Sequence, residues 1–71
     1  MIHSPAKKFQ VVLWETEDRV SNLPSLKLEF DTIEEARSEL RSHQRAGVYR
    51  TGILLEWNKV SSISDLLERY P

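Results

Sequence analysis

The stretch LKLEFDTIEEARSELRSHQRAG, residues 26–47, sets the architecture because it holds a strand, a helix start and a helix stop in succession. Leu26–Phe30 alternates apolar and charged side chains, which is the pattern of a half-buried strand. Thr32 followed by Glu35 fits a capping box, in which the two side chains satisfy amides of the first helical turn. Gly47 is a helix stop signal. The stretch therefore predicts a strand over 26–30 and a helix from Thr32 to just before Gly47.

Two further strands are predicted on either side of this stretch. Upstream, Phe9–Glu15 is rich in β-branched and aromatic residues on both of its faces, which favours a central strand covered on both sides. Downstream, Val48–Trp57 also has the composition of a strand, and Gly52 inside it indicates a bulge or a kink.

The last residues of the chain have the spacing of a second, short helix. Ser62-Ile63-Ser64-Asp65 resembles a capping box. The apolar residues that follow recur at i, i+3, i+4 and i+7, namely Ile63, Leu66, Leu67 and Tyr70.

The predicted fold is a small two-layer α+β domain with the element order β-β-α-β-α. We expect a three-stranded mixed sheet of order 2-1-3, with the first strand central and antiparallel to both neighbours and both helices on one face. The alternative is a meander in which the third strand pairs elsewhere. Residues 1–8 are expected to form a flexible tail, and residues 9–71 a single domain, because 71 residues leave no room for a second one.

The composition argues against several classes of function. The chain has no Cys, which rules out disulfides, thiol chemistry and Cys-based zinc sites. Its 10 Lys and Arg against 11 Asp and Glu give a net charge of −1, which argues against a dedicated DNA-binding domain. The longest apolar run, Val11–Trp14, is too short to cross a membrane, and no signal-peptide pattern is present. We therefore expect a cytoplasmic protein.

The sheet face away from the helices is the expected partner-binding surface. On the assumed register, Val12, Trp14 and Leu54 form its apolar centre and Arg50 lies at its rim. The alternative is that the second helix or the loop over residues 16–25 covers Trp14 and makes it part of the core. Backbone pairing at an exposed edge, through residues 26–30 or 48–57, is a second route to binding.

Three arginines lie on one flank of the predicted helix at i, i+4 and i+8: Arg37, Arg41 and Arg45. Guanidinium groups in a row can contact phosphates or an acidic partner. The simpler interpretation is a solvated helix flank on which Arg37 pairs with Glu34.

No catalytic, metal or cofactor site is predicted. His43 follows Glu39 by one helical turn, but a single Glu and a single His fall short of the roughly four ligands of a metal site. We therefore expect a non-catalytic protein-protein interaction module without a cofactor. Its small core makes a second copy of the chain a candidate partner. The alternative is a weak nucleic-acid-binding protein that uses the arginine row, although the near-zero net charge counts against it.

Overall fold

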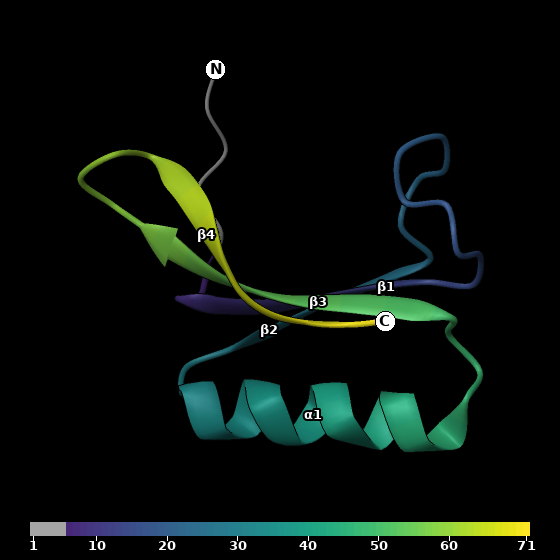
Figure 1. Ribbon diagram of the computed structural model, residues 1–71. Helices are drawn as coiled ribbons and strands as arrows, with labels where there is room; N and C mark the ends of the chain where they lie inside the picture. The colour runs from purple at the N-terminus through teal and green to yellow at the C-terminus, as the bar shows by residue number, and fades with distance from the viewer. Residues whose placement is uncertain (1–5) are drawn as a thin grey trace.

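The computed structural model describes residues 6–71, so residues 1–5 of the predicted tail lie outside the described residues. Its elements are β1 (Phe9–Trp14), β2 (Leu26–Phe30), α1 (Ile33–Ala46), β3 (Thr51–Asn58) and β4 (Ile63–Tyr70). The strands form one four-stranded antiparallel sheet in the order β2-β1-β3-β4, and α1 lies across one of its faces (Figure 1). The predicted α+β class is confirmed.

The first three strands have the predicted order, with β1 between β2 and β3 and antiparallel to both. The expectation of a mixed sheet is wrong, because β2 and β3 run parallel but never pair with each other. The helix α1 connects them by crossing over β1, whose two apolar faces suit this central position.

The second predicted helix is also wrong: its residues form β4, which makes a hairpin with β3. The turn between them is held at Asn58, whose side-chain oxygen accepts hydrogen bonds from the amides of Val60 (2.9 Å) and Ser61 (3.3 Å). Ser62 has a φ of 57° and donates from its amide to the Asn58 carbonyl at 2.8 Å. An isolated helix of this length is marginal in water, whereas β3 offers backbone partners along the whole segment.

The helix α1 has the predicted boundaries for the predicted reasons. Thr32 is the N-cap, and its hydroxyl accepts a hydrogen bond from the Glu35 amide at 3.3 Å. Gly47 ends the helix in the left-handed conformation, with a φ of 74°, and its amide donates to the His43 carbonyl. Ala36 and Leu40 are the buried residues of the helix.

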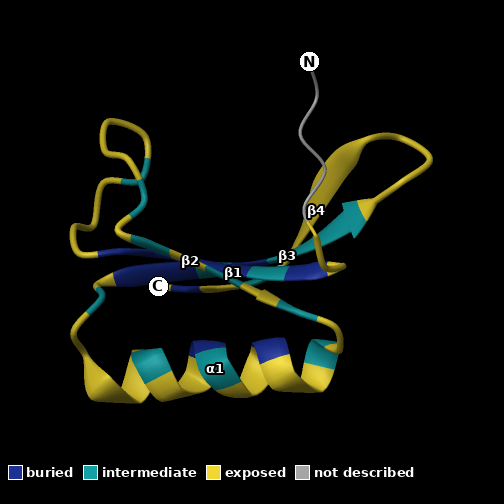
Figure 2. Cartoon of the chain, turned by 180° about the vertical axis from the view of Figure 1, so that it is seen from behind, coloured by how far each residue is buried: buried dark blue, intermediate teal, exposed yellow. Residues whose placement is uncertain are grey.

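The core lies between α1 and the sheet, as Figure 2 shows by the burial of β1. Its buried members are Phe9, Val11, Leu13, Ala36, Leu40, Leu54 and Tyr70. Burial raises the pKa of the Tyr70 hydroxyl, with a smaller contribution from Tyr49. That hydroxyl donates to the Tyr49 carbonyl at 3.2 Å.

Gly52 serves close packing between neighbouring strands. It lies opposite Leu13 of β1 on one side and Tyr70 of β4 on the other. The register shift of the sheet lies elsewhere, between Leu54 and Leu55 against β4.

The described part of the predicted tail is attached to the sheet. The Lys8 carbonyl accepts a hydrogen bond from the Trp57 amide at 2.8 Å. The Lys7 amide donates to the Glu29 carboxylate at 3.3 Å. These contacts place residues 7 and 8 in line with β1.

Candidate functional site

Within residues 6–71, the sheet face opposite α1, called here the open face, has no second layer of secondary structure (Figure 1). Val11 and Leu13 belong to the core beneath α1, so Val12 and Trp14 point to the open face. Cross-strand partners share a face, which extends the set through the pairs Val12–Ile53, Gln10–Leu55 and Leu55–Leu66. The apolar side chains of the open face are Val12, Trp14, Ile53, Leu55, Trp57 and Leu66.

The loop between β1 and β2, residues 15–25, covers one end of the open face. The Trp14 indole Nε1 donates to the Asn22 carbonyl at 3.0 Å, and Trp14 is only 7% exposed. Val12 beside it is also buried. Both residues therefore lie on the predicted face, but the loop-covered alternative describes Trp14 correctly.

Leu54, one of the four residues of the predicted patch, lies on the opposite face of the sheet. Leu54 pairs with Val11 on the helix-covered face and is fully buried, so its expected place on the open face is wrong. Side chains on both faces of β3 are apolar, so the sequence pattern does not show which face lies against the helix. The prediction placed Leu54 on the open face, whereas Ile53 and Leu55 occupy that face. Arg50 is exposed just before β3, with its Nη1 3.5 Å from the Glu17 carboxylate in the loop.

The loop is organised around Asp18. Its carboxylate accepts hydrogen bonds from the amides of Ser21 (3.1 Å) and Val20 (3.0 Å), and these bonds, with that of Ser21 the largest effect, lower the Asp18 pKa. The Asp18 carbonyl accepts from the Asn22 side-chain amide at 2.9 Å. Such bonds give a loop of this length a defined conformation.

Apolar side chains are exposed at both ends of the open face. The loop presents Val20 and Leu23, which are 96% and 90% exposed. The β3–β4 hairpin presents Val60 at 97% and Leu66 at 54%. Loop and hairpin both rise from the sheet on the side away from α1 (Figures 1 and 2), so these residues flank the half-buried Ile53, Leu55 and Trp57. The sequence does not predict this arrangement, because each of these apolar residues stands alone in its turn and only the fold brings the two turns to the same face.

Two members of the arginine row bind within the molecule. The Arg37 Nε contacts one carboxylate oxygen of Glu68 on β4, and the Arg41 Nη2 lies 2.6 Å from the other. The predicted partner of Arg37, Glu34, is replaced by Glu68 because β4 lies beside the helix. Arg45 is exposed and forms no ion pair within residues 6–71.

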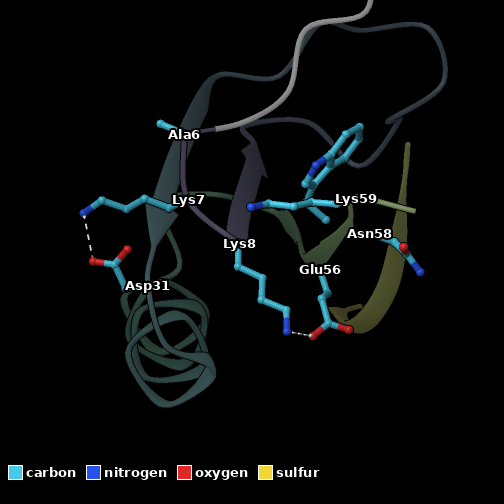
Figure 3. Close-up of a pocket in the computed structure, with 8 residues that line it drawn as sticks. Ala6, Lys7, Lys8, Asp31, Glu56, Asn58 and Lys59 are labelled. Atoms are coloured by element: carbon cyan, nitrogen blue, oxygen red, sulfur yellow. Dashed lines mark ion pairs between the residues drawn. The ribbon is translucent and has the colours of Figure 1, made fainter. Parts of the chain in front are cut away.

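A shallow groove of about 580 Å³ lies where the chain enters β1 and leaves β3 (Figure 3). Two of its lysines are paired, Lys7 with Asp31 at 3.6 Å and Lys8 with Glu56 at 3.5 Å. The lining residues are Ala6, Lys7, Lys8, Asp31, Glu56, Trp57, Asn58 and Lys59. The sequence reasoning missed this groove because its residues come from three separate segments.

His43 lies in a local cluster on α1. Its Nε2 is 3.1 Å from the Glu39 carboxylate, and its ring packs edge-to-face on Tyr49. Nowhere in residues 6–71 do three or more potential metal ligands gather. Over the same range, no helix has the length and apolar character needed to cross a membrane.

Comparisons with protein-family models, with curated proteins and with solved structures find no match to this chain.

Proposed function

We propose that this chain is a non-catalytic interaction module that binds a partner protein through the open face. The observation that supports this is the set of apolar side chains gathered there, from the half-buried Ile53, Leu55 and Trp57 to the exposed Leu66. Monomeric domains rarely expose contiguous apolar patches larger than a few hundred Å², and larger patches commonly mark binding sites.

The flanking loops favour a partner that inserts an apolar segment between them. Val20 and Leu23 on one side and Val60 on the other are almost fully exposed and would bury apolar area only on binding. The partner in this proposal is a protein segment with apolar side chains along one side.

The nucleic-acid alternative has less support. Phosphate groups would have to compete with Glu68 for Arg37 and Arg41, and Lys7 and Lys8 have acidic partners as well. Phosphate binding also weakens steeply with salt, whereas burial of an apolar patch does not.

The test is affinity capture from the native extract with three forms of the tagged chain, each run with and without nuclease. The forms are the wild type, the double variant Leu23→Asp with Leu66→Asp, and the control Val48→Asp. Val48 is 63% exposed in the connection from α1 to β3, so the control replaces one exposed apolar residue by aspartate away from the open face. Circular dichroism first checks that each form is folded.

We expect one protein to be captured by the wild type and the control, to be lost with the double variant, and to be unaffected by nuclease. Equal loss with the control, or equal capture by all three forms, would contradict the open-face proposal. Capture that disappears with nuclease and with rising salt would favour the nucleic-acid alternative instead.

A further inference from the structure

We propose that two copies of this chain associate by antiparallel pairing of their β2 strands, with Lys27 of each copy opposite Glu29 of the other. This surface is the β2 edge of the sheet, whereas the exposed part of the open-face patch lies on β3, β4 and the two loops, so the inference goes beyond the proposed function. It names the second copy of the chain as the occupant of one sheet edge.

The strand β2 is the regular edge of the sheet. The alternative edge predicted from the sequence, residues 48–57, is not an edge. Most of these residues form β3, which pairs with β1 on one side and with β4 on the other. The other edge, β4, has a register shift against β3, and irregularities of this kind disfavour edge pairing. All five residues of β2 pair with β1 in continuous register.

The hydrogen-bond directions leave the backbone of Lys27 and Glu29 pointing outward. Within residues 6–71, the Lys8 carbonyl accepts from the β3 residue Trp57, and the Leu13 carbonyl accepts from Ser25 next to β2. Even-numbered residues of β1 therefore bond to β3 and odd-numbered ones to β2. Leu28, opposite Val11, then directs its N–H and C=O inward to β1, and its two neighbours direct theirs to the free edge.

Charge selects one register for the pairing of two β2 edges. When Lys27 lies opposite Glu29 of the second copy, the same pair recurs by two-fold symmetry, and Leu28 faces its own counterpart at the axis. Sliding one strand by two residues keeps the faces and bond directions but places Lys27 opposite Lys27, or Glu29 opposite Glu29. Only the proposed register makes the edge complementary to itself.

The apolar side of β2 is incompletely covered by its own molecule. Val11 and Leu13 of β1 are fully buried under α1, whereas Leu26, Leu28 and Phe30 of β2 are only half-buried. In the proposed pair, Leu26 lies opposite Phe30 of the second copy on this same face. The two sheets become one continuous sheet with both helices on one side, which buries these side chains further.

The test uses the reversals Lys27→Glu and Glu29→Lys, each alone and mixed in equal amounts. Each single variant places like charges opposite one another, so we expect its dimer dissociation constant to rise at least about tenfold over the wild type. The mixture restores opposite charges at every pair, so a heterodimer should form. Analytical ultracentrifugation across a concentration series measures all three, with Lys59→Glu at the exposed hairpin tip as the matched control.

Hydrogen exchange gives the independent readout. We expect the Lys27 and Glu29 amides to become protected as wild-type concentration rises, while the Leu28 amide, already bonded to β1, stays unchanged. A wild type that is monomeric throughout, with no such protection, overturns the proposal. So does a dimer that survives both single reversals. The variants leave Leu23 and Leu66 intact, so the open-face proposal stands or fails separately.

Discussion

Gly52 on β3 lies in one cross-strand row with Leu13 and Tyr70, and both of these side chains lean over it. A Cβ at this position would come within 2.6 Å of the Tyr70 Cε2 and 2.7 Å of the Leu13 Cδ2. Because both side chains are buried, neither can move aside without disturbing the core. The absence of a Cβ at Gly52 therefore leaves the space that the Leu13 and Tyr70 side chains occupy.

We predict that Gly52→Ala lowers the free energy of unfolding by about 1–3 kcal/mol, the usual cost of overpacking a core. Urea unfolding followed by circular dichroism measures the change. The control is Ser38→Ala on the exposed side of α1, which should stay within about 0.5 kcal/mol of the wild type. A Gly52→Ala variant as stable as the wild type would show that the row has spare room.

Among the elements, β4 is joined to the rest of the molecule in two ways, by its pairing with β3 and by the contacts of Glu68 with Arg37 and Arg41 on α1. The Glu68 side chain is 19% exposed, whereas the two arginines are about half exposed. Ion pairs with this much solvent access contribute modestly to stability. The pairs are contacts between β4 and the arginine flank of the helix.

We predict a coupling energy of roughly 0.5–1 kcal/mol between Glu68 and Arg41 in a double-mutant cycle of alanine variants. The same cycle with Arg45, which lies one turn further along the helix, should give a coupling near zero. Thermal unfolding at low and high salt measures both cycles, and salt should reduce the first. Equal coupling in the two cycles would mean that the arginine row acts as a solvated flank.

For the whole molecule, the difference between the two sheet faces governs which apolar residues the fold requires. Leu54 is fully buried beneath α1, whereas Leu66 on the open face is 54% exposed. A domain of this size has only about 3–5 kcal/mol of stability from its core. Loss of one core side chain therefore threatens the fold itself.

We predict that Leu54→Ala costs about 2–5 kcal/mol and abolishes cooperative unfolding at 25 °C. Leu66→Ala should cost less than about 1 kcal/mol, because its side chain is already half in water. Near-ultraviolet circular dichroism and thermal melts compare the two variants. The reverse order of effects would mean that β3 presents its other face to the helix.

Local signals predicted much of this fold and little of its candidate site. The strand over 26–30 and the helix between Thr32 and Gly47 match residue for residue, because alternation and capping depend on near neighbours in the chain. The face of β1 that carries Val12 and Trp14 was also assigned correctly. For Trp14 the sequence left exposure and burial open as alternatives, because the choice depends on a loop that returns over this residue from eight residues away.

The sequence by itself determined the α+β class, the helix with both of its ends, and the central place of β1 between two antiparallel neighbours. Only the tertiary structure decided that residues 63–70 are a strand, that Leu54 faces inward, and that Glu68 holds two arginines of the row. The spacing of Ile63, Leu66, Leu67 and Tyr70 suits a helix, and both faces of β3 are apolar. Local preferences were nearly balanced at these positions, so cross-strand pairing and burial against distant residues determined the outcome.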